Sequence, residues 1–297
     1  MEPGTTKQTP RRAARHSLSN PQDPVATVRP WEAPIDEDTL THYRRVLGDD
    51  HPVTLRLANN LAAGLRALGE HEQARELDED TLSRYRRVMG DDHPATLDSA
   101  NNLAADLRAL GEHEEARELH EDTLARRRRV LGDADPATLR SARNLAEDLR
   151  ALGEHERARE LDKDTLARRR RVMGDEHPVT LRSANNLAVG LCVLGEHERA
   201  RELDEDTLAR RRPVLGDDHP DTLSSAHNLA DDLCALGQHE QAHQLHEDTL
   251  TRRRRVLGDD HPDTLRTAHN LAADLRALDK HEQAHQLEQW ITSHDRS

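Results

Sequence analysis

A six-residue segment recurs along this chain at a constant interval. It reads Leu-Gly-Asp-Asp-His-Pro in the first copy, and successive copies or close variants of it begin 42 residues apart, at Leu47, Met89, Leu131, Met173, Leu215 and Leu257. A fixed period of about 20 to 50 residues indicates stacked supersecondary units rather than a single globular core. The fold of the whole chain is therefore constrained by what one such unit can form.

Each unit predicts two amphipathic helices. In the first unit, apolar residues recur mostly three or four positions apart and indicate a helix over about 52–68, with the stripe Leu55, Ala58, Leu61, Ala62, Leu65 and Leu68. A second stripe indicates a helix over about 70–89 and consists of Ala74, Leu77, Leu82, Tyr85 and Val88. Pro52 suits the first position of the earlier helix, and Gly69 and Gly90 suit the positions that follow the two helices.

The composition requires these hairpins to stack. Hydrophobic residues make up 34% of the chain and charged residues another 34%, and Phe is absent. A hairpin with so narrow an apolar stripe cannot bury it alone, so its neighbours must cover it. We expect an array over 36–293, made of a half repeat at 36–47 and six 42-residue repeats, with Trp290 and Ile291 capping the last stripe. Residues 1–35 lack periodicity, which predicts a disordered tail.

The unit resembles the tetratricopeptide repeat in its 42-residue, kinesin-light-chain-like form. The residues that carry this resemblance recur along the array and are, in the first unit, Asn60, Leu61, Ala62, Leu65, Gly69 and Ala74, with a His-Pro pair that the third unit replaces by Asp135-Pro136. The resemblance implies an all-α, right-handed superhelical solenoid of antiparallel helix hairpins, whose first helices line a concave face that binds proteins or peptides. The family usually has an aromatic residue where this chain has Asp78, His120, Asp162, Asp204 and His246.

An asparagine recurs at one interior position of the first helix in every unit: Asn60, Asn102, Asn144, Asn186, Asn228 and Asn270. Asparagine is a poor helix former, so the recurrence needs a cause. Each amide either satisfies a polar group of the neighbouring hairpin or faces the groove and binds a peptide N–H and C=O together. The resemblance implies the second role, and from the sequence both interpretations stay open.

Further polar side chains should surround these asparagines on the same face. The predicted groove adds Asn59, Asn101, Arg143 and Asn185 beside them, and Arg66, Arg108, Arg140, Arg150 and Arg182 about one to two turns away along the helices. Guanidinium groups recognise carboxylates and phosphates in bidentate geometry. We therefore expect an extended, acidic protein segment as the partner.

The charge and hydropathy of the chain argue against other partners. A net charge of −14 disfavours nucleic acid, because phosphate binding depends on lysine and arginine. No segment has the apolar length of a membrane span or a secretory signal, and we expect a cytoplasmic protein. Arginine runs such as Arg126–Arg129 follow acidic helix starts, so we interpret them as helix-dipole matching and ion pairs between repeats.

Two sequence features suggest chemistry. Cys192 and Cys234 occupy equivalent positions in adjacent units, about 9–10 Å apart for packed helices, which is too far for a disulfide. The zinc-binding pattern His-Glu-x-x-His occurs at His239–His243 and His281–His285, but its first histidine belongs to the repeat and its second replaces an exposed arginine. We interpret both copies as surface, leave open a loose metal site that includes His246, and expect no enzyme activity, no metal and no cofactor.

Three functions are carried forward from the sequence. The favoured one is a scaffold that binds another protein or peptide on its concave face. The alternatives are a structural array that self-associates through its repeat ends and a sensor module of a larger signalling system. One local prediction concerns Pro213, which stands in the last turn of a second helix and should end that helix early.

Overall fold

The computed structural model describes residues 36–294, and all thirteen elements in that part of the chain are α-helices. The predicted disordered tail at 1–35 lies outside the described residues. The first helices of the units are α2 (Pro52–Ala67), α4 (Pro94–Ala109), α6 (Pro136–Ala151), α8 (Pro178–Val193), α10 (Pro220–Ala235) and α12 (Pro262–Ala277). The second helices are α1 (Glu37–Leu47), α3 (His71–Met89), α5 (His113–Leu131), α7 (His155–Met173), α9 (His197–Leu215), α11 (His239–Leu257) and α13 (His281–His294).

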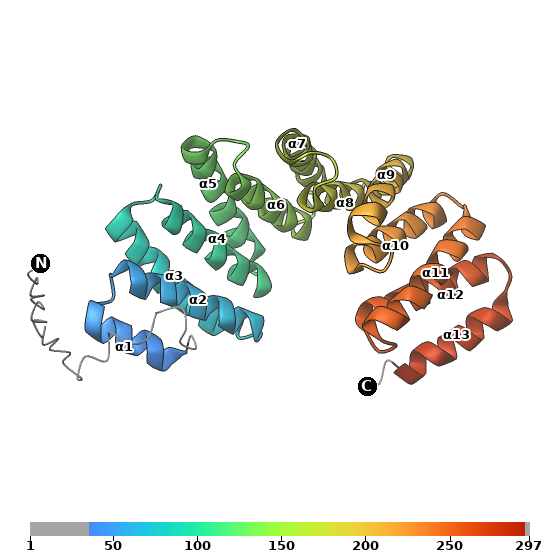
Figure 1. Cartoon of the computed structure of the whole chain (residues 1–297), viewed down its shortest axis with the longest axis horizontal. Helices are drawn as coiled ribbons and strands as arrows, with labels where there is room; N and C mark the ends of the chain where they lie inside the picture. The colour runs from blue at the N-terminus through green and yellow to red at the C-terminus, as the bar shows by residue number, and fades with distance from the viewer. Residues whose placement is uncertain (1–35, 295–297) are drawn as a thin grey trace, which may run out of the picture.

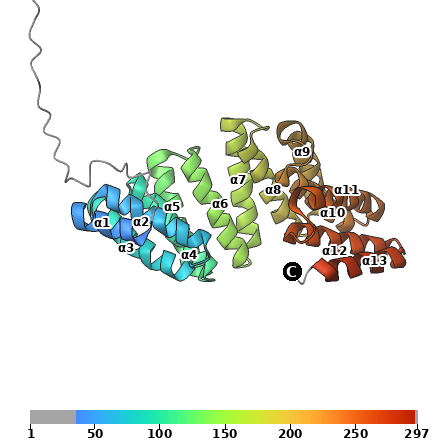
Figure 2. The same ribbon diagram turned by 60° about the horizontal axis from the view of Figure 1, so that its bottom comes forward.

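The helices stack in chain order into an arch (Figure 1). Every helix packs against the next one. First helices of neighbouring units also contact each other, for example α2 with α4 and α10 with α12. The second helices α5, α7 and α9 lie on the outer rim of the arch, whereas the first helices line its inside (Figure 1). Turning the molecule shows that successive hairpins also rotate about the long axis (Figure 2). The predicted all-α solenoid of helix hairpins is confirmed.

The recurring six-residue segment forms the link between units. His51 precedes α2, and its Nδ1 accepts a hydrogen bond of 3.2 Å from the N–H of Val53. Capping satisfies one of the N–H groups that a helix start leaves free, and Pro52 lacks the N–H that would otherwise need a partner. In the third unit the Asp135 carboxylate replaces the histidine and accepts from the N–H of Ala137 at 2.8 Å. The sequence motif is therefore a helix cap that two different side chains can provide.

The turn inside each hairpin needs a left-handed backbone. Gly69 has φ 82°, a conformation that residues with a Cβ rarely adopt. In the last unit Asp279 takes the equivalent position with φ 58°, which aspartate tolerates better than most residues. The first helix thus ends at Ala67, one residue before the predicted end, and the second begins at His71, one residue after the predicted start.

The core is divided among the junctions between units. A representative cluster takes Leu124 from α5, Ala158 from α7 and, from the intervening α6, Ala142, Leu145, Ala146 and Leu149. The alanines are almost completely buried, so the helix backbones approach closely. At the last unit, Ile291 is buried in the final cluster and Trp290 packs against it, which confirms the predicted cap. Each hairpin therefore depends on its neighbours for burial.

The prediction for Pro213 is wrong. Helix α9 continues through Pro213 to Leu215, the same register at which α5 and α11 end. A proline in the last turn removes one backbone hydrogen bond. The N–H of Gly216 still bonds to the Arg212 carbonyl at 3.0 Å, and packing against α8 and α10 holds the rest of the turn.

Candidate functional site on the concave face

On the inner side of the arch, each first helix carries a stripe of exposed side chains. On α2 the exposed residues Arg56, Asn60, Ala63 and Ala67 are three or four positions apart and therefore lie on one face of the helix. We call this stripe, together with its counterparts on the other first helices, the concave face. None of the described helices is long and apolar enough to cross a membrane.

Half of the recurring asparagines are hydrogen-bonded to the preceding unit. The Nδ2 of Asn144 donates to Oδ1 of Asn101 at 3.0 Å, and Asn228 donates to Asn185 at 3.3 Å. In the last unit Asn270 donates to Oδ1 of Asp231 at 2.6 Å. These three amides connect adjacent first helices, so the structural interpretation applies to them.

The other three asparagines have side chains with no such bond. Asn60 is exposed, and Asn102 and Asn186 are half-buried. Within residues 36–294 none of these three side-chain amides makes a hydrogen bond. Each keeps both a donor and an acceptor available at the concave face.

Three of the predicted groove arginines are paired inside the array. Arg66 lies between two fully buried carboxylates, with Nη2 2.9 Å from Asp78 Oδ2 and 2.8 Å from Asp106 Oδ2. Its counterparts behave similarly: Arg108 reaches Asp148 at 3.3 Å, and Arg150 bonds to Asp162. We call these three clusters the arginine junctions. Their guanidinium charges are balanced by carboxylates of the stacked repeats.

The remaining groove residues differ in how free they are. Arg140 pairs with Asp98 at 2.9 Å, and Arg143 donates to Asn144 Oδ1 at 3.2 Å. Asn59 accepts a hydrogen bond of 3.3 Å from the Ser99 hydroxyl. Arg182, by contrast, is exposed and has no ion pair with any described residue. The inner face is consequently less basic than the sequence indicates.

Two cysteines replace the arginine in later units. Cys192 and Cys234 are half-buried and free of disulfide bonds. Around Cys192 lie the buried Asp204 and Asp232, and around Cys234 lie the buried His246 and Asp274. We call these clusters the cysteine junctions.

Burial changes the titration of several of these acids. Burial, with a hydrogen bond to Asp106, raises the pKa of Asp78 to about 8 despite the Arg66 guanidinium. Burial also raises the pKa of Asp204 to about 8, with the nearby Asp232 adding to the effect. Asp162, which has its own arginine, has a pKa raised by burial only to about 6. The pKa of a buried acid in these junctions thus depends on whether a cation lies beside it and on how many acids share that cation.

Sequence reasoning missed a row of buried arginines. Arg127 is 1% exposed and donates to the Ala137 carbonyl at 2.9 Å and to the Ser141 hydroxyl at 2.8 Å. The same position is buried in the other arginine runs, at Arg169, Arg211 and Arg253. In the first unit this position is Tyr85, a member of the apolar stripe. Alignment of the repeats could therefore have predicted that one arginine in each run is buried.

Exposed arginines of the runs form the predicted ion pairs, and Arg128 reaches Asp164 of the following repeat at 3.8 Å. Arg126 lies 3.0 Å from Asp92 Oδ1, and Arg129 lies 2.6 Å from the same atom. Asp92 belongs to the acidic link that precedes α4, the first helix of the same hairpin as Arg126 and Arg129. The link carboxylates thus pair with arginines of the following second helix.

The structure does not assemble the zinc-binding pattern suggested by the sequence. His239 lies near Cys234, with Nδ1 3.6 Å from Sγ, whereas His246 faces Asp274 and Asp231. No described cluster of potential metal ligands contains both His239 and His243. His281 and His285 are exposed.

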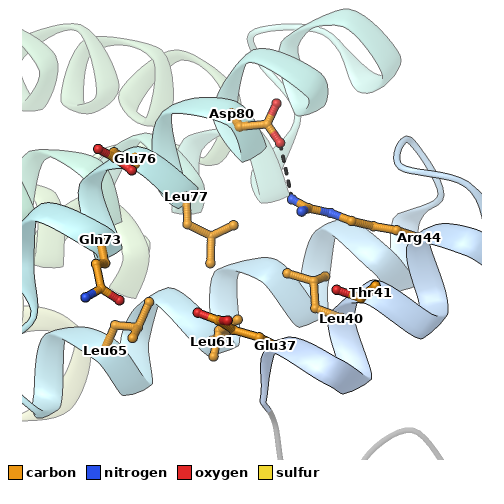
Figure 3. Close-up of a pocket in the computed structure, with 10 residues that line it drawn as sticks. All are labelled: Glu37, Leu40, Thr41, Arg44, Leu61, Leu65, Gln73, Glu76, Leu77 and Asp80. Carbon is orange, nitrogen blue, oxygen red and sulfur yellow. Dashed lines mark hydrogen bonds and ion pairs between the residues drawn. The ribbon is translucent and has the colours of Figure 1, made fainter.

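A hollow of about 510 Å³ lies at the first end of the array, between α1 and α3 and above α2 (Figure 3). Its apolar wall consists of Leu40, Leu61, Leu65 and Leu77, and an ion pair of 3.4 Å between Arg44 and Asp80 closes one side (Figure 3). The helix α1 is shorter than the other second helices. It begins at Glu37, which corresponds to Glu79 in α3, whereas α3 begins eight residues earlier, at His71. Leu40 and Leu61 are buried, whereas Leu65 and Leu77 are half-buried.

A second cavity, of about 360 Å³, opens on the concave face among α8, α10 and α12. Val189 and Val193 line it and are 39% and 53% exposed, which is unusual for this face. Its polar lining includes Asn228, Asp231 and Arg266. On α8 the stripe Arg182, Asn186, Val189 and Val193 thus combines an unpaired cation, an unpaired amide and exposed apolar surface.

Comparison with known proteins gives consistent results. The tetratricopeptide repeat family model matches residues 34–87, 54–129, 97–171, 137–191, 179–255 and 231–297. Among curated proteins no sequence match was found. A solved kinesin-light-chain-like protein of nearly identical TPR-like repeats from Podosopora anserina is 31% identical, with a TM-score of 0.63 over 68% of this chain and 95% of that chain.

Two more distant structures share the fold. BtubC (BKLC) from P. vanneervenii is 21% identical, with a TM-score of 0.64 over 75% of this chain and 89% of its own. A signal transduction ATPase with numerous domains from Pyrococcus horikoshii, which has a tetratricopeptide repeat sensor, is 15% identical. Its TM-score is 0.67 over 86% of this chain and 39% of that chain.

Proposed function

Because the chain belongs to the tetratricopeptide repeat family, in its kinesin-light-chain-like form, we propose that it is a non-enzymatic scaffold that holds an extended segment of another protein on its concave face. The observation that carries this proposal is the set of unpaired amides at Asn60, Asn102 and Asn186. An amide with a free donor and a free acceptor can bind the N–H and C=O of an extended chain together.

Helix α8 defines the chemistry of the bound segment. Arg182 would pair with a carboxylate of the partner, and Asn186 would bind its backbone one turn further along. The exposed Val189 and Val193 would contact an apolar side chain that enters the adjacent cavity. The proposed partner is therefore a protein segment that combines an acidic residue with an apolar one, rather than a uniformly acidic segment.

A peptide library in extended form, with acidic and apolar positions varied independently, tests this function on the full chain. Sequences that combine both residue types should bind, and Asn186→Ala or Arg182→Ala should weaken their binding at least about 10-fold, a loss of about 1.4 kcal/mol. The matched control is Arg140→Ala, which removes an arginine already paired with Asp98 and should change affinity less than about 3-fold. Equal losses in Arg182→Ala and Arg140→Ala would contradict the assigned groove.

Self-association through the repeat ends is a second candidate. The hollow between α1 and α3 favours it, because the half-buried Leu65 and Leu77 present apolar surface near one end of the array. Leu77→Glu should then reduce the molar mass measured by light scattering at high concentration. A mass that is monomeric in the unmodified chain at every concentration would exclude this candidate.

A further inference from the structure

The arginine and cysteine junctions differ in their balance of buried charge. Where Arg66 stands in the first unit, its guanidinium bonds to Asp78 and Asp106. Cys192 occupies the equivalent position three repeats further along, but both acids remain, as Asp204 and Asp232. These carboxyl groups are 1% and 2% exposed, and no arginine or lysine within residues 36–294 forms an ion pair with either. The substitution removes the cation and keeps the acids.

The two acids also have unsatisfied oxygens. Oδ1 of Asp204 and Oδ2 of Asp232 are buried and have no hydrogen-bond partner among the described residues. Oδ1 of Asp78 is also unpaired in the Arg66 junction, so the oxygen that is free only in the cysteine junction is Asp232 Oδ2. Buried polar atoms without a partner are uncommon, and each one calls for an explanation. A cation bound at this junction would pair with the Asp232 carboxylate and give its free oxygen a partner.

Three side chains here match the donor set of a transition metal. A Cys192 Sγ, a His197 nitrogen and an Asp232 carboxylate oxygen all lie within 4.8 Å of one another. Sγ is 3.7 Å from His197 Nδ1. Zinc bonds sulfur at about 2.3 Å and nitrogen at about 2.0–2.1 Å, so two such ligands of a tetrahedral ion are about 3.5 Å apart. The existing separation is close to that of a formed site.

From this geometry we propose that Cys192, His197 and Asp232 bind one zinc ion, with water as the fourth ligand. The Cys192 thiol loses its proton to solvent when zinc binds, and the thiolate and carboxylate then balance the ion's two charges. Asp204 faces the same cavity and can accept a hydrogen bond from the zinc-bound water. This site revises the expectation from the sequence that the chain binds no metal.

Access to the site runs through the concave face. Cys192, Asp204 and Asp232 line the cavity of about 360 Å³ that also contains Val189 and Val193. An ion can therefore enter from solvent without separating the repeats. The zinc site does not depend on the peptide-binding proposal.

The second cysteine junction is already satisfied. Asp274 accepts from Cys234 Sγ at 2.9 Å through Oδ1 and lies 2.6 Å from His246 Nδ1 through Oδ2. Burial lowers the pKa of His246, but hydrogen bonds with Asp231 and Asp274 outweigh it and raise the pKa overall. His246 stands where the first cysteine junction has Asp204, so this junction has a single buried acid, whose two oxygens both have partners. We expect one zinc ion for each chain and not two.

Titration of the chelator-treated full chain with zinc alone, followed by calorimetry, measures the affinity and stoichiometry. Cobalt provides the second readout, because thiolate coordination adds a charge-transfer absorption that carboxylate or imidazole ligands do not produce. The expected result is one equivalent of bound metal with a thiolate band. Failure to bind zinc below about 100 µM, or cobalt binding without that band, would overturn the proposal.

Substitutions locate the site. Cys192→Ser should weaken zinc binding at least about 100-fold, and Cys192→Arg should do the same while rebuilding an arginine junction that the fold already accommodates at Arg66. The matched control Cys234→Ser should leave binding unchanged. Zinc binding that survives both Cys192 variants, or that is lost only in His227→Ala, would place the metal at the neighbouring cluster of His227, Asp231 and His246 and refute this assignment.

Discussion

At the Arg66 junction a guanidinium lies between two carboxyl groups that repeat stacking has buried, whereas at the Cys192 junction a thiol takes that position beside two equally buried acids. The helices and the apolar clusters around the two kinds of junction are nearly the same. The comparison shows that stacking fixes where the acids are buried but leaves open which cation balances them. An arginine, a buried histidine and, in our proposal, a zinc ion are alternative partners for a buried acid at this position.

The largest expected effect comes from removing an arginine from such a junction. Arg66→Ala leaves Asp78 and Asp106 buried without their cation, and breaking a buried pair in this way costs about 3–5 kcal/mol. Cys192→Ala in zinc-free protein should cost about 1 kcal/mol, because no ion pair is lost there. Urea unfolding followed by circular dichroism measures both. If the two substitutions cost the same, arginine does not have the balancing role assigned to it.

Buried arginines of the same row lie near both the arginine junctions and the cysteine junctions. They test whether the two regions differ only at the junctions themselves. Arg127 belongs to the arginine region and Arg211 to the cysteine region, and each donates to a serine hydroxyl within 2.8 Å. Arg127 also pairs with the exposed Asp98 at 2.6 Å, and an ion pair to an exposed partner adds little. Replacing either arginine by Ala should therefore cost a similar amount, about 2–3 kcal/mol. The exposed Arg128 is the control, with an expected cost below about 0.5 kcal/mol. A large difference between Arg127→Ala and Arg211→Ala would mean that the two regions differ in more than one position.

A pH series sharpens the comparison within the arginine junctions. The pKa of Asp78 is raised to about 8, so its carboxyl binds a proton more tightly in the folded chain than in the unfolded one. The contribution of Asp78 to the free energy of unfolding is therefore fully present below about pH 4 and is lost as the pH rises towards 8. Asp162, with a pKa raised to about 6, should lose its smaller contribution between about pH 4 and 6.

Asp78→Asn tests this window, because asparagine stays neutral at every pH. Between pH 4 and 8 the stability of the variant should fall less than that of the unmodified chain, by up to about 5 kcal/mol. Melting temperatures across that range provide the measurement, and Asp162→Asn is the matched control with a smaller effect at its upper end. An Asp78→Asn profile parallel to that of the unmodified chain would show that Asp78 does not titrate there.

The smallest effect distinguishes the two classes of asparagine. Asn144→Ala removes the hydrogen bond to Asn101 and should cost about 1 kcal/mol. Asn186→Ala removes no hydrogen bond with the described residues and should change stability by less than about 0.5 kcal/mol. Thermal unfolding of the two variants measures the difference directly. A greater loss in Asn186→Ala would assign its amide a structural role and remove it from the proposed groove.

Much of the architecture could be predicted from residues close together in sequence. The stripe that begins at Leu55, the proline at position 52 and the glycine at position 69 all act within one or two turns, so they indicate the helices and their ends directly. Pro213 shows the limit of this reasoning, since local propensity predicted an early end and packing on both sides maintained the helix. The candidate site was predicted only as a list of positions on one helix face.

The sequence by itself determined the period, the hairpin and the face on which the asparagines lie, because these depend on spacing within a unit. Only the tertiary structure decided which polar side chains are free. Arg66 finds Asp106 and Asn144 finds Asn101 at separations of 40 and 43 residues, across the contact between repeats. The rotation of one hairpin relative to the next sets those distances, and it results from the packing of whole helices rather than from any short segment.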